Sequence, residues 1–464
     1  MCAGTQARSG LALTGICLGF LVVLFDATAV NVATGDIAGS LGASVVVVQW
    51  VLNAYTVAFA AFMLTAGGLG DSCGARRVYL AGSVLFAVAS AACAAAPTAP
   101  ALIAARAVQG VGAAAVVPCS LALIAHRFPA RRARARALGV WGGVSGVGLA
   151  AGPVVGGGLV AALGWRAVFL VVVPIAATSI AIVAARLGEV PRRAATRPDI
   201  AGQVLVVTAL LALTAALTQT ATLGWTDPRT VGLLGAAALA GGGFVLVEHR
   251  VREPMLPLSL FADARFSGAT GVGLLFNLGL YGVLFCLALV LERTAHRSAA
   301  VAGLALLPLT AVVAVCALAS GRLSTRFGPR TPMMAGLAGG LVATGLLAAF
   351  GDHLGVAGLA GLGAVLGLVG LAMPALTGVA LAAAGPARAG LGAAVLNTAR
   401  QAGGALGVAL LGSAAFARSP AGGLDDPRLL APMTLAATGY LVALVLTLTT
   451  VDGSTRRPGR PARR

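Results

Sequence analysis

The chain has 464 residues, of which 59% are hydrophobic and only 10% are charged. Ordinary soluble domains contain roughly 25% charged residues, so a water-soluble enzyme and a disordered chain are both excluded. The composition also excludes an outer-membrane barrel, whose strands would alternate polar and apolar residues. A mean hydropathy of +0.96 indicates that lipid is the main solvent. We therefore expect an all-α polytopic membrane protein embedded in a lipid bilayer.

The net charge of +18 is carried by arginine alone, because the chain has no lysine. The arginines cluster in short segments between apolar runs, which is the pattern that sets membrane topology, and no nucleic-acid binding is expected. The seven cysteines have no C-x-x-C spacing, and the four histidines share no ligand spacing. We therefore expect no metal site, no disulfide framework and no cofactor.

In chain order, the apolar runs predict fourteen transmembrane helices, since one span needs roughly 20 apolar residues. The first run, from Leu11 to Phe25, resembles a signal peptide, but Asp26 and the many later spans favour an uncleaved first helix. The predicted spans lie near residues 11–32, 45–66, 78–96, 99–125, 137–162, 167–185, 200–219, 230–247, 268–291, 299–319, 332–350, 354–382, 389–415 and 432–450.

The distribution of arginine predicts the orientation of these spans. With the N-terminus inside, 24 arginines fall in inner segments, six fall in outer loops and two fall within helices. Cytoplasmic loops of membrane proteins carry the excess of basic residues. We therefore predict a multi-pass protein of the cytoplasmic membrane with both termini in the cytoplasm.

An internal repeat predicts the division of the chain. The segments GGLGDSCGAR (67–76) and GRLSTRFGPR (321–330) share Gly, Leu, Gly and Arg at four offsets and follow the second and tenth spans. Parallel halves of this kind are a known transporter plan. The predicted parts are an N-terminal six-helix half over 1–190, two inserted helices with a linker over 191–265, a C-terminal six-helix half over 266–451 and a basic cytoplasmic tail over 452–464.

Asp26 is the only acid well inside a predicted span. A charge in that position costs several kcal/mol unless it is paired or faces water, and burial favours the neutral form of a carboxyl group. Asp26 and Arg106 both lie about seven residues from the outer ends of their helices, roughly 10 Å below the outer face. Gln109 is one turn from Arg106. We predict that these three residues form a proton-coupling site, although a static structural role stays open.

The fifth span contains a row of small residues. Gly148, Gly152, Gly156 and Gly157 form a small-xxx-small face that lets another helix approach closely. Pro153 removes one backbone hydrogen bond and is expected to kink the helix. Generic helix packing is the alternative explanation of this pattern.

The loop after the second span carries charge. Asp71 is predicted near the start of the third helix, where an acid complements the helix dipole, with Arg76 and Arg77 bracing it. The second copy of the repeat has Thr325 in place of Asp71. Only the first copy can therefore place a charged group there.

Isolated polar residues inside other spans are candidates for a substrate cavity. A lone asparagine is about as often a hydrogen-bonding contact between helices. The candidates are Asn53, Asn277, Asn397, Arg400 and Gln401.

Five motifs occur in order along the chain, at the spans where one family places them. They are FDATAVNVA (25–33), GGLGDSCGARR (67–77), AARAVQGVGAA (104–114), GLAAGPVVGG (148–157) and NTARQAGGALG (397–407). With them the chain resembles the major facilitator superfamily, specifically its fourteen-span drug:proton antiporter branch. The segment EHRVREPMLPLSLF is similar to exporters of antibiotic-producing actinomycetes.

The resemblance implies roles for these motifs. The loop with Gly67, Asp71, Gly74, Arg76 and Arg77 would be a cytoplasmic gate latch. The helix-5 motif would block a leak pathway and favour export over uptake. Basic residues common in the family's loop motif are replaced here by serine and alanine, which predicts a weaker latch.

These observations predict proton-coupled efflux of a small, neutral or weakly acidic antibiotic by a monomer that is not an enzyme. No G-x-x-x-x-G-K-[ST] motif is present, so an ion gradient must supply the energy. Two alternatives remain. One is a transporter of an endogenous metabolite on the same fold, either importer or exporter, and the other is a membrane-embedded enzyme with a lipid-linked substrate.

Overall fold

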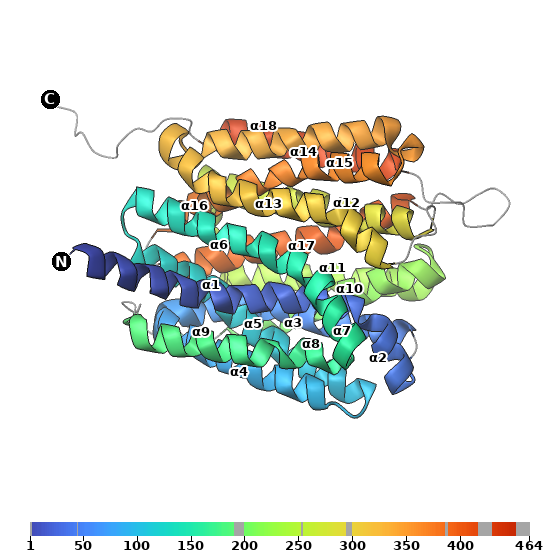
Figure 1. The fold of residues 1–464 in the computed structure, drawn as a ribbon, viewed down its shortest axis with the longest axis horizontal. Coiled ribbons are helices and arrows are strands. Elements are labelled where there is room, and N and C mark those ends of the chain that lie inside the picture. Colours follow the sequence, from blue (N-terminus) through green and yellow to red (C-terminus); the bar gives the residue numbers. More distant parts are fainter. Residues whose placement is uncertain are drawn as a thin grey trace.

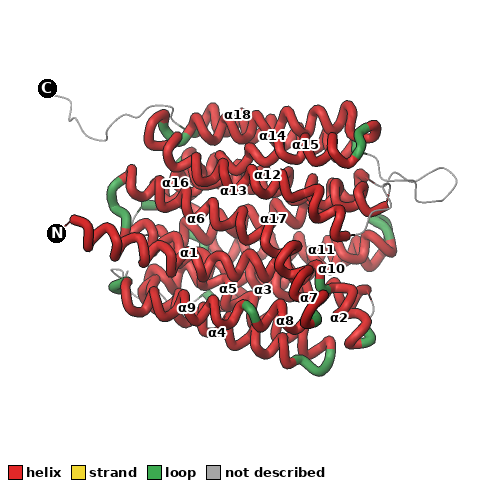
Figure 2. Tube along the Cα trace, viewed as in Figure 1, coloured by secondary structure: helices red, strands yellow, loops and turns green. Residues whose placement is uncertain are grey.

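A computed structural model of the chain is helical throughout its described residues, which are 2–43, 45–189, 199–251, 254–293, 299–385, 388–415 and 429–451. The helices run side by side along the long axis of the molecule (Figure 1), and short loops join them at the two ends (Figure 2). The predicted tail over 452–464 lies outside the described residues.

The long helices alternate in direction and are interrupted at a few positions by π-helical or 3-10 turns. The α-helices are α1 (Cys2–Val32), α2 (Thr34–Leu41), α3 (Val45–Leu69), α4 (Ala75–Ala95), α5 (Ala99–Arg127), α6 (Arg131–Ala151), α7 (Gly157–Leu163), α8 (Arg166–Leu170), α9 (Val172–Arg186), α10 (Ile200–Leu223), α11 (Pro228–Arg250), α12 (Ala264–Arg293), α13 (Ala299–Phe327), α14 (Arg330–Phe350), α15 (Val356–Leu366), α16 (Ala372–Ala384), α17 (Ala389–Ala415) and α18 (Leu430–Thr450). The interruptions are η1 (Gly70–Gly74), η2 (Gly152–Gly156), η3 (Leu258–Ala262), η4 (Gly351–His353) and η5 (Gly367–Leu371).

Each of the fourteen predicted spans coincides with one helix or with a run of consecutive helices. Among the described residues, eleven segments are long and apolar enough to cross a membrane, and the segment Val47–Ala95, of 49 residues, contains two predicted spans. The all-α fold predicted from composition is therefore confirmed. The short helix α2 was not predicted.

The fifth and twelfth spans are not continuous α-helices. The fifth changes at η2 into a π-helical turn that contains Pro153, and then continues as α7. Proline has no N–H to donate, so one hydrogen bond of the α-helix is missing at this position, and single π-turns are a known irregularity within α-helices. The structure therefore places a local change of helix type at the proline where the sequence predicts a kink. The twelfth span is divided by η5 into α15 and α16.

Helix ends follow ordinary capping rules. The Thr98 side chain accepts a hydrogen bond from the backbone N–H of Ala101 at the start of α5, and Asp227 accepts one from Arg229 at the start of α11. Such side chains satisfy backbone donors that have no partner within the helix. The sequence therefore fixes these two helix starts locally.

The helices pack in two groups. In the first, α1 packs on α6 and α9, while α3 and α4 pack on α5; in the second, α12 packs on α17 and α18, and α14 packs on α18. Figure 1 shows α14 and α18 of the second group at the top and α4 and α9 of the first group at the bottom, with α6 and α17 between them. The groups meet where α6 contacts α13 and where α3 and α5 contact α17. The exact residue boundaries of the two halves stay a prediction.

The helices α10 and α11 form a hairpin that packs mainly on itself and, through α10, on α3. Only 22% and 17% of the residues in their apolar windows are buried. Large apolar side chains such as Leu239 and Ile200 are 80% and 71% exposed. An exposed apolar surface of this size is suited to lipid. These are the two helices that the sequence predicts as an insertion.

The first residue of α1 and the last residue of α18 lie at the same end of the bundle, on the left in Figure 1. We call this end the terminal end and the opposite end the distal end. Because successive spans alternate in direction, η1 after α3 and the start of α17 also lie at the terminal end.

Candidate functional site

Asp26 on α1 and Arg106 on α5 form a fully buried ion pair. The side chains are 0% and 1% exposed, and Nη1 of Arg106 lies 2.5 Å from Oδ2 of Asp26. Nε2 of Gln109 donates to the other carboxylate oxygen over 3.0 Å, and Oε1 of Gln109 accepts from Arg106 over 2.6 Å. The three residues that the sequence predicts as one site are therefore in contact.

Residues that sequence reasoning did not select complete this network. The Nε of Arg106 donates to the backbone carbonyl of Val51 over 3.2 Å, and its guanidinium lies 4.2 Å from the ring centroid of Tyr55. Gln109 also donates to the hydroxyl of Ser90 over 2.8 Å. A buried charge is tolerable when it is paired and hydrogen-bonded in this way. The amino-acid type of Val51 gives no indication of this role in the sequence, because only its backbone carbonyl takes part in the network.

Helix α1 also packs against the face of the fifth span that carries Gly148, Gly152 and Gly156, which we call the glycine face. A methyl group at Gly152 would collide with Thr28, and one at Gly156 would lie 2.8 Å from Cβ of Ala29. A methyl group at Gly148 would lie 3.0 Å from Cβ of Leu24, whereas one at Gly157 would meet only Val32, at an ordinary 3.6 Å. The glycines at 148, 152 and 156 thus permit a close approach to the helix that carries Asp26.

Asp71 forms a contact with the other half of the molecule that the sequence does not predict. Its two carboxylate oxygens accept hydrogen bonds from the backbone N–H groups of Gly390 and Leu391, each over 3.0 Å. These groups belong to the first turn of α17 in the other half, where N–H groups have no partner within the helix. We call Asp71 with these two N–H groups the latch. Helix α4 begins only at Ala75, so Asp71 lies before its first turn.

The other residues of this loop support the latch. A methyl group at Gly67 would lie 2.7 Å from the carbonyl oxygen of Gly390, so α3 and α17 can approach only because residue 67 is glycine. Gly74 has a φ of +105°, a conformation that L side chains rarely adopt. Arg76 donates to the carbonyl of Ala184 over 2.7 Å, and Arg77 pairs with Glu189 over 3.3 Å. These two arginines therefore hold the loop to the end of α9.

Asn53 is not placed with the other polar candidates. Its Nδ2 donates to the hydroxyl of Thr218 on α10 over 3.1 Å. Nearby, Nε2 of Gln203 donates to the carbonyl of Ala61, and Gln203 also bonds to Thr65. Asn53 therefore joins the inserted hairpin to α3, which is the contact between helices that the sequence leaves open as the alternative to a cavity role.

The remaining candidates lie on α12 and α17. Arg400 donates from Nη1 to Oδ1 of Asn397 over 3.0 Å, and Nη2 lies 3.8 Å from the sulfur of Met373. Asn277 is 1% exposed, and Gln401 is partly buried beside Arg400. Among the residues the structure describes, His, Cys, Asp and Glu side chains form no group of three that could hold a metal ion.

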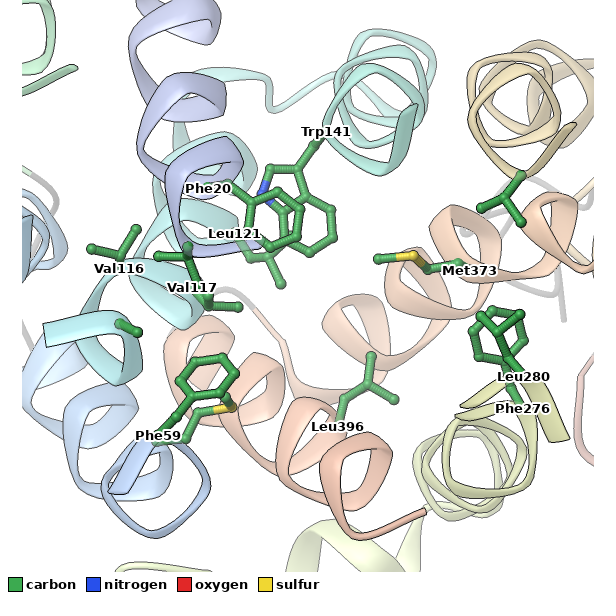
Figure 3. Close-up of a cluster of buried hydrophobic side chains, with 14 of the residues drawn as sticks. Phe20, Phe59, Val116, Val117, Leu121, Trp141, Phe276, Leu280, Met373 and Leu396 are labelled. Carbon is green, nitrogen blue, oxygen red and sulfur yellow. The ribbon is translucent and has the colours of Figure 1, made fainter. Parts of the chain in front are cut away.

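Apolar side chains from both halves face one another in the middle of the bundle. Figure 3 shows Phe20, Phe59, Val117 and Leu121 opposite Leu396 and Met373, with Phe276 beyond Met373. Trp141 stacks on Phe20 with ring centroids 3.9 Å apart, and its indole donates to Ser120 over 3.0 Å. The region between the halves is thus apolar, with a few polar groups at its edges, which is the usual composition of a small-molecule site.

Comparisons with known proteins agree with this architecture. The family model of the Major Facilitator Superfamily matches residues 16–408. The chain is 39% identical over 327 residues to the methylenomycin A resistance protein of Streptomyces coelicolor, covering 70% of this chain and 69% of that protein. It is 36% identical over 376 residues to the multidrug resistance protein Stp of Mycobacterium tuberculosis, covering 80% and 70%.

A solved structure shows the same fold. The human organic anion transporter MFSD10 (TETRAN) superposes with a TM-score of 0.67 at 17% identity, covering 96% of this chain and 99% of that one. The family comprises transporters and not enzymes, and the similar relatives include antibiotic and multidrug resistance proteins. Sequence motifs, helical architecture and a family match over most of the chain lead to one assignment. This protein belongs to the major facilitator superfamily.

Proposed function

We propose that the protein exports a small antibiotic from the cytoplasm in exchange for protons. The observation that supports this most directly is the completely buried Asp26, whose only charged partner among the described residues is Arg106. A titratable acid inside a membrane domain marks a proton pathway by default. The resistance proteins to which the chain is similar support a toxic compound as the cargo.

Protonation of Asp26 would remove the charge that Arg106 neutralises. Arg106 would keep the carbonyl of Val51, the amide of Gln109 and the ring of Tyr55 as partners. The carboxyl group would then be free to move relative to α5, and α1 would transmit this change to the glycine face at Gly152. Proton binding is thereby linked to the packing of α1 between α5 and the fifth span.

The latch supports an alternating-access mechanism. Asp71 connects α3 in one half to α17 in the other at the terminal end. The excess of arginine on this side in the sequence favours a cytoplasmic location for the terminal end, in the cytoplasmic membrane. The conformation described here is then closed toward the cytoplasm, and breaking the latch would open the substrate path to that side.

The apolar region between the halves favours a neutral or weakly acidic cargo. Dicationic compounds need carboxylates to offset two desolvated charges, and Asp26 is already paired with Arg106. The described residues of α12, α13, α14 and α16 to α18 carry no acidic side chain apart from Glu292, at the distal end of α12. The proposed working unit is a monomer, since both halves of the transport path lie in one chain.

Transport measurements in everted membrane vesicles test this proposal. Respiration acidifies the vesicle interior, and a pH-sensitive dye reports the gradient. Methylenomycin A is added to vesicles with and without the protein. We expect drug accumulation together with partial loss of the gradient only in vesicles that contain the protein. Accumulation that persists after the gradient is abolished by an uncoupler would contradict proton coupling.

A further inference from the structure

The C-terminal half contains an arginine within a span, Arg400, that has no carboxylate partner among the described residues. Arg400 lies near the middle of α17, and no acidic side chain of the described residues is within 4 Å of it. Its Nε has no hydrogen-bond partner, and its hydrogen-bonding contacts are the amide of Asn397 and the sulfur of Met373. Arg106, by contrast, is neutralised by Asp26. A guanidinium in such surroundings is costly unless an anion joins it.

A second unsatisfied polar group lies on the facing helix. Asn277 on α12 is 1% exposed, and neither atom of its amide has a hydrogen-bond partner. A methyl group at Gly273 would lie 3.1 Å from Cγ of Arg400, and the ring of Phe276 lies 6.0 Å from its guanidinium. Residues 273, 276 and 277 share one face of a helix. Asn277 is therefore on the face of α12 that Arg400 packs against.

Arg400 lies beside the apolar region between the two halves. Leu396, one turn before Arg400, lies among Phe59, Val117 and Met373 (Figure 3). The sulfur of Met373 contacts Arg400 and also accepts a hydrogen bond from Ser145 on α6, over 3.6 Å. Arg400 is only partly buried although α17 packs against helices of both halves. Its side chain therefore lies at the edge of the apolar region where the two halves meet.

We propose that Arg400 and Asn277 bind a single oxyanion, typically a carboxylate, of the transported compound. Guanidinium binds carboxylate through two parallel charge-assisted hydrogen bonds, and the Asn277 amide can donate a third. Phe276, Met373 and Leu396 would contact the apolar part of the same molecule. The cargo class is thus an amphipathic monoanion. This inference rests on the proposed function, because it names the cargo of that same transport path.

Equilibrium binding to the purified full-length protein tests the assignment without any gradient. Methylenomycin A and fusidic acid, each with its methyl ester, are titrated while thermal unfolding is followed. We expect each acid to bind wild type at least tenfold more tightly than its ester. Arg400→Gln should remove this preference and retain ester binding. Arg326→Gln, which removes an exposed arginine, should leave the preference unchanged.

A second variant keeps the test informative if Arg400→Gln does not fold. Asn277→Asp adds a carboxylate to the face of α12 that Arg400 packs against, so it should raise the unfolding temperature without ligand and abolish acid binding. Equal affinity for acid and ester in wild type, or no binding of either, overturns the assignment, as does an acid preference that survives in Arg400→Gln. Acid-selective binding without gradient-driven transport would instead support the oxyanion site at Arg400 and Asn277 and refute the proposed proton-coupled efflux.

Discussion

Asp71 and Gly390 are 319 residues apart in the sequence, yet the carboxylate of one accepts a hydrogen bond from the backbone N–H of the other over 3.0 Å. The contact joins the end of the second span to the first turn of the thirteenth. A negative charge at a helix N-terminus is stabilised by the unpaired N–H groups and by the helix dipole. Separation of the two halves at the terminal end must break this contact.

Asp71→Ala should therefore shift the conformational equilibrium toward opening at the terminal end. The variant loses two hydrogen bonds to a charged acceptor, each worth about 1.5–3 kcal/mol, so a shift of at least about tenfold is expected. Turnover should fall strongly while substrate affinity stays within about threefold of wild type, a difference of less than 1 kcal/mol. Asp36→Ala removes an exposed acid from α2 and serves as the control. Loss of binding affinity in proportion to turnover would contradict a gating role.

Asp26→Asn should abolish gradient-driven export, because asparagine keeps the size and polarity of the side chain but cannot exchange a proton. It also leaves Arg106 buried without a charge partner, which costs about 3–5 kcal/mol, so the unfolding temperature should fall. Gel filtration of a fluorescent fusion checks that the variant is inserted and monodisperse. Facilitated exchange of substrate without a gradient should persist. Wild-type rates of gradient-driven transport in this variant would refute the proton-coupling role.

Gly152→Ala should impair transport, because its methyl group would collide with Thr28 on the helix that carries Asp26. Overpacking of this kind typically costs about 1–3 kcal/mol. Gly157→Ala is the matched control, since its methyl group would meet only Val32 at 3.6 Å. Transport rates and unfolding temperatures of the two variants should differ clearly. Equal behaviour would show that close packing of α1 on the glycine face is unimportant.

Asn53→Ala should leave substrate specificity unchanged, because Asn53 bonds to Thr218 on the inserted hairpin. Loss of this hydrogen bond should cost about 0.5–1.5 kcal/mol of stability. Thr218→Ala should have a similar effect, and the double variant should lose no more than either single variant. Minimum inhibitory concentrations for a panel of antibiotics measure the specificity. A changed pattern of resistance would contradict this prediction and indicate that Asn53 contacts the substrate.

The sequence by itself determined the helices and their approximate bounds, because the bilayer imposes a local requirement. Each span must be apolar, long enough to cross, and satisfied in its own backbone hydrogen bonds. The depth of Asp26 and Arg106 was predictable for the same reason, since helical rise converts residue count into height. Their ion pair was a geometric possibility before the structure placed the side chains in contact.

Only the tertiary structure decided which faces of the helices meet. The sequence predicts Asp71 near the start of the next helix but does not indicate its hydrogen bonds to the start of α17. For Asn53 the sequence leaves a cavity role and a contact between helices open, and the structure shows a hydrogen bond to Thr218 on α10. Both outcomes depend on the rotation and register of helices that are distant in the sequence, and in uniformly apolar spans no periodic pattern encodes that rotation. The position of a residue within its apolar span determines its depth in the membrane, whereas the packing between helices determines which residue it contacts.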